Sequence, residues 1–441
     1  MKNQINTAID VAATRMHVFI LGIMLIALAC TTSAMEVKNT DEVNDTKVML
    51  SLSETIQRIL TNNPELKGFA FLKQQWQGQK DTAELKPAFR LNLGADNVFG
   101  TAPYTGISQA ELSLSLSSVI ETGKKRFWRG QQFEQQIHIS EFDQQLATLD
   151  VLANATQIHI TLLSIQAHIK LSKAEQQWAE QNLKMAQTRF KKGVAFEAEV
   201  FQAKAALKQT ELKQLRLENQ QKYWQLTLAN LWGSAVADFK SVTGDLMTFN
   251  QHQPLDVLLL NLENSPYIQQ FTAANRLQEI TRQQINASSK SDFSWELGIN
   301  RIQETQDTAI TAGFSMPLFK KKRNRGMLST NAAKTAHIYL QQQQQTLKLK
   351  TQLRLAYQQR NTSVSEAKQL KNKVIPWLKK AHKETLKAYQ LGRYSYQELL
   401  NVQQQVLDAE RQLIDTAVAS HRQETTIEQL SAQSLNNRSA Q

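Results

Sequence analysis

A glycine interrupts the glutamine-rich stretch AYQLGRYSYQELLNVQQQVLDAERQLI, residues Ala388 to Ile414, which otherwise reads as one long helix. The stretch RFKKGVAFEAEVFQAKAALKQTELKQL, residues Arg189 to Leu215, has the same layout around its own glycine. The two glycines, Gly392 and Gly193, lie 199 residues apart (392 − 193), and the same offset relates residues on both sides of them. The shared layout and the shared offset predict that the chain contains two copies of one unit.

Gly193 and Gly392 are interpreted as tight turns at the ends of two long helical hairpins. Glycine closes a helix readily because it adopts a positive φ without a steric penalty. On local grounds each glycine could equally be the C-cap of a surface helix, and the shared offset favours the hairpins. Helical patterns extend over about 141–232 and about 328–430. Each flanking helix is therefore predicted to have roughly 40 residues and a length on the order of 60 Å.

The last helical segment has an adjacent apolar pair every seven residues. This spacing implies left-handed supercoiling, and a pair per heptad lets the helix pack against a partner on each side, as in the wall of a tube. Pro376, ahead of the second glycine, is predicted to kink or divide its helix because it removes a helical hydrogen bond. The pairs are Leu399 with Leu400, Val406 with Leu407 and Leu413 with Ile414.

Each half also contains two segments in which apolar and polar residues alternate, and this period of two predicts strands. The segments are about 88–96 and 109–119, then about 292–302 and 308–318. They are either half-buried hairpins of a soluble domain or transmembrane strands with one face towards lipid. Four strands cannot close a barrel, and an open sheet edge is not stable in lipid. If the strands cross a membrane, the chain must oligomerise.

Charge and the N-terminus bear on location and partners. The net charge of +12 favours anionic partners, such as the phosphates of lipid or nucleic acid. Residues 1–34 are predicted to be an export signal, because an apolar run from Val18 to Ala29 follows Arg15 and precedes small residues. The run is too short to span a bilayer as a helix. Cleavage is predicted after Ala34, with cleavage before Cys30 and lipidation of that cysteine as the alternative. Export argues against nucleic acid as a partner.

The predicted organisation is a signal peptide over 1–34, a first repeat over 35–250 and a second repeat over 251–441. No H-E-x-x-H, G-x-S-x-G or P-loop motif occurs, and the single cysteine cannot form a C-x-x-C site. His159 and His168 lie nine residues apart and do not share a helix face at ligand spacing. No enzymatic activity, cofactor or metal site is predicted.

Six motifs resemble those of the TolC-type outer-membrane efflux proteins, and within them the CzcC-like branch of heavy-metal resistance-nodulation-division export systems. The resemblance covers nearly the whole chain after the signal peptide, and the motifs follow one another in the family's order. The motifs are the opening helix SLSETIQRILTNNPELKG, the strand-to-helix exits SVIETGKKRFWRG and SMPLFKKKRNRG, the hairpin tips RFKKGVAFEAEV and YQLGRYSYQELLN, and LANLWG at the end of the first repeat.

The resemblance implies an α+β membrane protein that forms a trimeric TolC-like duct. Each chain would give four strands to one shared β-barrel in the Gram-negative outer membrane, and long coiled-coil hairpins to a helical tube in the periplasm. The implied function is the passive exit of substrate, with heavy-metal cations as the expected cargo, from an inner-membrane resistance-nodulation-division transporter through a periplasmic adaptor. The alternatives are a duct for drugs or other small molecules, a passive porin, and an exported coiled-coil structural protein.

The resemblance also implies roles for residues at the two hairpin tips. Gly193 and Val194, with Gly392 and Arg393, would form the mouth that docks on the adaptor. In the family pattern an arginine and an aromatic near the second tip help to hold the closed state. Tyr389 matches the aromatic. The arginine position holds a different residue, with Arg393 one place away, so gating by the same bonds is not implied.

The family's ring of carboxylates near the tips falls on Glu398 and Asn401, with Glu199 as the counterpart in the first repeat. Asn401 departs from the acidic pattern. Three copies of Glu398 around an axis would attract cations and raise one another's pKa. The alternative is that both glutamates are solvated tip residues.

Two basic clusters lie where strands lead into helices, and outer-membrane lipid is their expected partner. Near-surface cations attract lipid phosphates, with about 1 kcal/mol for each. A solvated junction without lipid binding is the alternative. The clusters are Lys124, Lys125, Arg126 and Arg129 in the first repeat and Lys320, Lys321, Lys322, Arg323 and Arg325 in the second.

Overall fold

The computed structural model describes residues 49–251, 253–318 and 324–432. The predicted signal peptide and Cys30 lie outside the described residues, as do four of the five basic residues of the second cluster.

The first half contains two short helices, a strand pair and two long helices. Its elements are β1 (Met49–Leu50), α2 (Leu52–Asn62), α3 (Pro64–Ala83), β2 (Arg90–Asp96), β3 (Glu111–Ile120), α4 (Lys125–Lys191) and α5 (Glu197–Asn230).

The second half runs through the same order of helices and strands. Its elements are β4 (Ser241–Val242), α6 (Leu255–Glu263), α7 (Pro266–Ser288), β5 (Phe293–Ile302), β6 (Asp307–Ser315), α8 (Arg325–Gln369), the π-helical turn η2 (Leu370–Val374), α9 (Ile375–Gln390) and α10 (Tyr396–Leu430).

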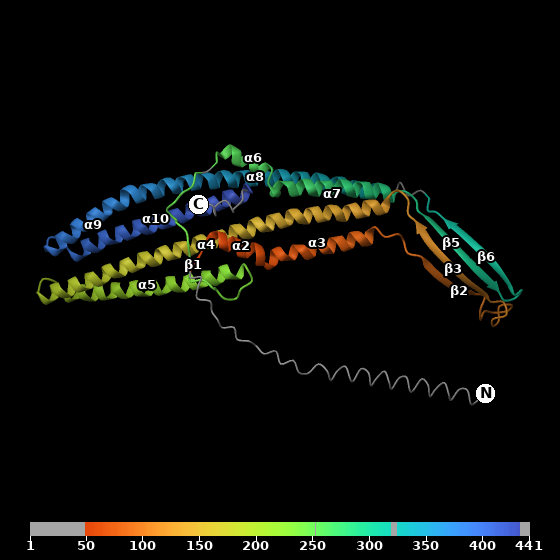
Figure 1. Ribbon diagram of the computed structural model, residues 1–441, viewed down its shortest axis with the longest axis horizontal. Helices are drawn as coiled ribbons and strands as arrows, with labels where there is room; N and C mark the ends of the chain where they lie inside the picture. Colours follow the sequence, from red (N-terminus) through yellow and green to blue (C-terminus); the bar gives the residue numbers. More distant parts are fainter. Residues whose placement is uncertain (1–48, 252, 319–323, 433–441) are drawn as a thin grey trace, which may run out of the picture. The chain divides into compact units, whose positions relative to one another are not determined.

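β2, β3, β5 and β6 form one antiparallel sheet in that spatial order (Figure 1). The two edge strands, β2 and β6, each pair on one side only within the described part of the chain. The register places Leu91 opposite Leu116 and Leu116 opposite Leu297. The same row continues on β6, where Ala312 lies opposite Leu297. The apolar positions of all four strands therefore share one face.

The apolar face of the sheet is not covered by other described residues of the chain. Leu93 is 81% exposed and Ile310 is 83% exposed. The opposite face is lined by small and polar side chains, including Asn92, Ser115 and Gly298, which follow one another in register. An exposed apolar surface of this kind marks contact with a partner or a membrane.

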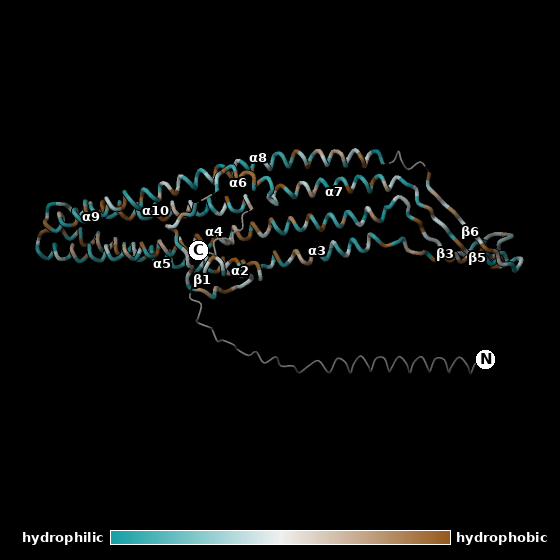
Figure 2. Tube along the Cα trace, turned by 45° about the horizontal axis from the view of Figure 1, so that its top comes forward, coloured by the Kyte–Doolittle hydropathy of each residue, from teal (hydrophilic) through white to brown (hydrophobic). Residues whose placement is uncertain are grey.

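α4 forms the core of the helical part, because it packs against α2, α3, α5, α7 and α10. It contains a stretch that is long and apolar enough to cross a membrane, but half of that stretch is buried inside the protein. Ala153, Ala155 and Leu162 are among its buried residues. A core helix explains this stretch, and Figure 2 shows apolar residues at short intervals along the other helices too.

The helix that leads to Gly193 is longer than the roughly 40 residues expected from the sequence. α4 has 67 residues and begins at Lys125, directly after a left-handed Lys124 with φ of 61°. A helix of this length extends on the order of 100 Å. The returning helices are shorter, with 34 residues in α5 and 35 in α10. The expectation failed because the first turns of α4 are rich in polar residues and lack a strong helical period.

The second hairpin is divided, in agreement with the expectation for its proline. α8 has 45 residues, and the five-residue turn η2 separates it from α9. Pro376 lies in the first turn of α9, directly after η2, and its missing N–H removes a hydrogen bond of the helix there. α4 continues without interruption at the corresponding place.

Candidate functional site

The two hairpin tips have the same backbone geometry. Gly193 has φ of +74° and Gly392 has φ of +75°. In the first tip the Val194 N–H donates to Arg189 O at 3.0 Å, and in the second the Arg393 N–H donates to the matching helix carbonyl at 2.8 Å. This pattern is a Schellman motif, in which a glycine in the left-handed region ends the helix and satisfies its last carbonyls.

Glu398 lies in the first turn of α10 and caps that helix. Its Oε2 accepts hydrogen bonds from the backbone N–H of Ser395 at 2.7 Å and from the Ser395 hydroxyl at 2.8 Å. The Ser395 Oγ accepts in turn from the Glu398 N–H at 3.2 Å. These bonds lower the pKa of Glu398. The signal for this role is in the sequence, because Ser395 and Glu398 have the spacing of a capping box.

Asn401 and Glu199, the other predicted members of the carboxylate ring, have different surroundings. Asn401 is exposed on α10, and its Oδ1 accepts a hydrogen bond from Gln397 Nε2 at 3.0 Å. Glu199 lies in the first turn of α5, where the N-cap is Phe196 and no side chain caps the helix. Its Oε2 is buried without a hydrogen-bond partner.

Arg189 of the first hairpin contacts the second hairpin at the tips. Its Nη1 donates to Tyr389 O at 3.1 Å, and its guanidinium carbon lies 4.7 Å from the centre of the Tyr389 ring. Its Nη2 donates to Val194 O at 3.4 Å. Sequence reasoning searched for this arginine in the second hairpin and missed it, since the contact crosses between hairpins.

Tyr389 and Tyr396 pack together between the hairpins, with ring centroids 6.0 Å apart. Burial raises the pKa of both phenols, and the Glu199 carboxylate raises them further. The pKa of Tyr396 rises to about 12. Apolar residues of both hairpins surround the pair. They are Ala186, Val200, Ala203 and Leu399.

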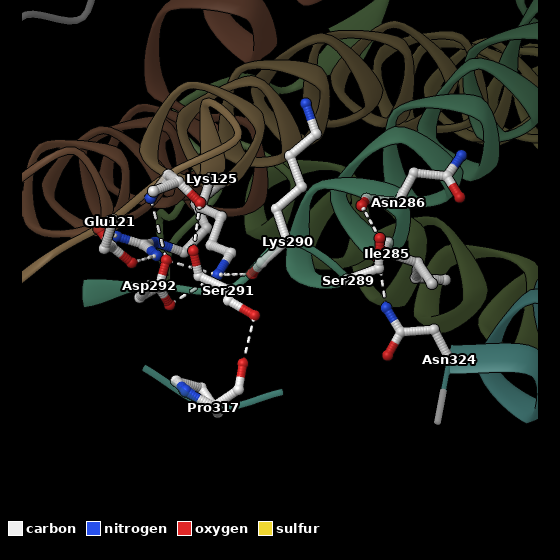
Figure 3. Close-up of polar contacts among 12 residues, drawn as sticks. Glu121, Lys125, Ile285, Asn286, Ser289, Lys290, Ser291, Asp292, Pro317 and Asn324 are labelled. Atoms are coloured by element: carbon white, nitrogen blue, oxygen red, sulfur yellow. Dashed lines mark hydrogen bonds and ion pairs between the residues drawn. The ribbon is translucent and has the colours of Figure 1, made fainter. Parts of the chain in front are cut away.

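A buried ion pair joins the two halves where the sheet meets the helices (Figure 3). Lys125 Nζ lies 2.6 Å from both carboxylate oxygens of Asp292 and donates to Lys290 O at 2.7 Å. Asp292 also accepts from the Thr122 N–H at 3.0 Å. Breaking such a pair by removing one partner is strongly destabilising, because it leaves a buried charge. Lys125 is thus part of the junction and is not available to lipid.

Arg129 of the first basic cluster is also engaged within the protein. Its guanidinium bonds both carboxylate oxygens of Glu121, and its Nε donates to Ala83 O at 3.1 Å. The bond to Glu121 raises the pKa of Arg129. Of this cluster, Lys124 is exposed and Arg126 is half-buried. The expected lipid contact of the first cluster is reduced to these two residues.

Three carboxylates lie in one row at the loop end of the sheet, on its polar face. Asp96 pairs with Glu111, and Asp307 occupies the same row two strands further, opposite Ile302. Sequence reasoning missed this row. Strand alternation alone placed Asp96 on a polar face but did not give the register that aligns it with the other two.

The described residues contain no group of three or more His, Cys, Asp or Glu side chains that could hold a metal ion. His159 Nε2 donates to Thr243 O at 3.0 Å, and burial lowers its pKa. His168, also on α4, has its Nε2 3.1 Å from a carboxylate oxygen of Asp415 on α10. The two histidines do not meet.

The first half of the chain, with its hairpin and its strand pair, is similar to a known family of proteins. The family model for outer membrane efflux proteins matches residues 55–234. The match begins in α2 and ends just after α5, so it contains the first strand pair and the first hairpin.

The chain is similar along most of its length to a curated relative. It is 23% identical over 337 residues to the cobalt-zinc-cadmium resistance protein CzcC of Cupriavidus metallidurans, covering 75% of this chain and 78% of the relative.

Solved structures of outer-membrane channels share its fold. The OprN channel superposes with a TM-score of 0.73 at 16% identity, over 86% of this chain and 89% of that one. CusC gives 0.71 at 15%, over 87% and 92%. VceC of Vibrio cholerae gives 0.70 at 16%, over 86% and 95%. The chain therefore has the fold of these outer-membrane channels.

Proposed function

We propose that this protein belongs to the outer membrane efflux proteins, that it is the exit duct of a tripartite metal-efflux pump and that it works as a trimer. The observation that carries the proposal is the sheet. It has one exposed apolar face, and within the described ranges no strand pairs with the outer side of either edge strand, β2 or β6. Lipid does not tolerate such edges, so the sheet must close. Pairing β6 of one copy with β2 of the next closes it, and three copies of four strands give one twelve-stranded barrel (3 × 4).

Aromatic residues support the placement of the sheet in a membrane. Trp295 lies opposite Phe314 near the end of the sheet that meets the helices. The Phe89 ring lies 6.2 Å from that of Trp295. Outer-membrane barrels have aromatic girdles at their interfaces, next to an apolar band on the outer surface. Phe89, Trp295 and Phe314 match such a girdle on the periplasmic side.

The helices also have surfaces that need neighbours in a tube. α5 exposes Leu212 and Leu215, and α8 exposes Leu340 and Leu347. In a closed tube each hairpin has another hairpin on both sides, so these residues would be buried between copies. We further propose that the two halves, with their shared order of elements, arose as two repeats of one unit, which gives the tube its regular wall.

The hairpin tips are proposed to dock on a periplasmic adaptor, which links the duct to an inner-membrane resistance-nodulation-division transporter. Gly193, Val194, Gly392 and Arg393 form the two exposed turns. Val194 is 59% exposed at the end of its turn. An exposed apolar residue on a rigid turn suits a protein contact. Glu199, Tyr389, Glu398 and Asn401 lie close behind these turns, and the proposed gate is there.

Heavy-metal cations are the proposed cargo. The relative CzcC is named for cobalt, zinc and cadmium resistance. The row of Asp96, Glu111 and Asp307 supports the same class of cargo, because a trimer would place nine carboxylates (3 × 3) around the outer end of the barrel. Rings of carboxylates favour cations in channels.

The proposal is tested by light scattering of the detergent-extracted protein and by single-channel recording in a planar bilayer. A trimer with small, cation-selective conductance steps is the expected result. The variant Asp96→Asn/Glu111→Gln/Asp307→Asn should lose much of its cation selectivity while it remains a trimer. Glu304→Gln is the matched control, because Glu304 lies in the loop between β5 and β6 and outside the aligned row.

Two results would contradict parts of the proposal. A monomer that never inserts would remove the barrel and leave an exported coiled-coil protein. A trimer whose selectivity is unchanged in the triple variant would remove the argument for cations and favour a duct for other small molecules.

A further inference from the structure

Four buried polar atoms lack hydrogen-bond partners where the two hairpins touch near their tips. They are Tyr389 Oη, Tyr396 Oη, Glu199 Oε2 and Arg189 Nε. Tyr389 is 1% exposed and Tyr396 is 5% exposed, so neither phenol reaches solvent. The four residues come from α4, α5, α9 and α10, which means that the atoms collect at the contact between hairpins.

These atoms oppose the contact that buries them. A buried polar group without a partner loses its hydrogen bonds to water and gains none in return. If the hairpins separate, water reaches the phenols and the carboxylate, and this cost disappears. The contact is held by apolar packing and by the bond from Arg189 to Tyr389 O. Apolar packing and the Arg189 bond therefore stabilise the contact between the hairpins, whereas the unpaired polar atoms destabilise it.

We propose that the phenol hydroxyls of Tyr389 and Tyr396, together with Glu199, weaken the closed contact so that the hairpins are poised to separate. This inference rests on the proposed function, which places a gate at the tips, and it takes separation of the two hairpins there as the step that opens the gate. A partner that docks at the tips then needs only a small preference for the separated state, because a nearly balanced equilibrium shifts with little free energy.

The inference predicts that removing the hydroxyls strengthens the closed state. Tyr389→Phe and Tyr396→Phe keep the rings and their packing, and each should lower the ratio of open to closed duct about tenfold, equivalent to about 1.4 kcal/mol. Single-channel open probability in a planar bilayer measures this ratio. Tyr394→Phe is the matched control, because Tyr394 lies in the second tip and is 47% exposed. It should leave the ratio unchanged.

Hydrogen exchange provides a second readout that does not depend on conduction. Amides of 183–190 and 396–403 should exchange more slowly in Tyr389→Phe and in Tyr396→Phe than in the parent protein. If the parent protein forms no channel, the proposed function fails, and slower exchange still supports the inference. If either variant opens more often, or if both exchange at the parent rate, the hydroxyls do not oppose closure and the inference is wrong.

Discussion

The two hairpin tips share a turn but differ in the residue that starts the returning helix. The repeat offset of 199 places Ser395 of the second tip on Phe196 of the first, and Glu398 on Glu199. Ser395 and Glu398 form a complete capping box, which holds the glutamate on its own helix. Phe196 offers no cap, and Glu199 lies instead against the tyrosines between the hairpins.

This difference shows that a repeat position does not determine a residue's role. The same glutamate caps a helix in one tip and contributes a buried, unpaired oxygen in the other. The residue three positions earlier decides between these roles. It is Ser395 in the second tip and Phe196 in the first. Arg189 adds to the asymmetry, because the second tip has Ala388 at the corresponding place.

Arg189→Met should have the largest effect on the contact between the tips. It removes a charged hydrogen bond to Tyr389 O and a guanidinium stacked on the Tyr389 ring. The expected loss is about 2 kcal/mol of local stability. Hydrogen exchange of the tip amides should become about thirtyfold faster. Arg393→Met is the control, as this arginine belongs to the other tip. Equal effects of the two variants would show that Arg189 does not join the hairpins.

Gly193→Ala and Gly392→Ala should destabilise the tips to a similar extent. Both glycines have positive φ, and a Cβ there meets no other atom within 4 Å. The cost is therefore backbone strain alone, about 1–2 kcal/mol for each. Thermal unfolding followed by circular dichroism measures it. Gly326→Ala, in the first turn of α8 with negative φ, should not destabilise. A large difference between the tips would mean that one turn is held by contacts outside itself.

Phe196→Ser should make the first tip resemble the second. Phe196 is 81% exposed and already has the extended backbone of an N-cap. A serine there forms a capping box with Glu199, which stabilises the start of α5 by about 1 kcal/mol. The reciprocal variant, Ser395→Ala, should destabilise α10 by a similar amount. Exchange rates at the two helix starts test both. A destabilising Phe196→Ser would show that its ring makes a needed contact.

The smallest effect is a pH dependence confined to the second tip. Hydrogen bonds from Ser395 lower the pKa of Glu398 below its usual value of 4.5. A lowered pKa gives stability above pH 4.5 that is lost as the pH falls through the lowered pKa. Exchange at the start of α10 should therefore speed up in acid, after correction for the intrinsic rate. Ser395→Ala should abolish this change. Its persistence would place the titrating group elsewhere.

The periodicity of apolar residues predicted those elements in which one period runs from end to end. The four alternating segments overlap the four strands of the structure, and the two glycines lie in turns with positive φ. The length of α4 was underestimated, since its first turns lack a clear apolar stripe. A helical period is visible where one face of the helix is apolar and packs. A mostly polar stretch of helix has no apolar stripe and gives little of this signal.

Contacts between distant segments could not be predicted from one sequence. Lys125 was interpreted as part of a basic cluster, because its acidic partner Asp292 is 167 residues away in the sequence. The Arg189 contact crosses 200 residues. The row of Asp96, Glu111 and Asp307 depends on strand register. The capping box at Ser395 is different, as its spacing is local and was available to the sequence reading.

The π-helical turn η2 gives the two hairpins unequal stiffness. A π-turn adds one residue to the helical path, so the face that packs in α8 is not continuous with the face that packs in α9. Bending at η2 disturbs little side-chain packing, because the packing face of α8 already ends there. The unbroken α4 has no such place to yield. The second hairpin is therefore expected to bend more easily than the first. Tyr389, Gly392 and Tyr396 lie beyond the bending point.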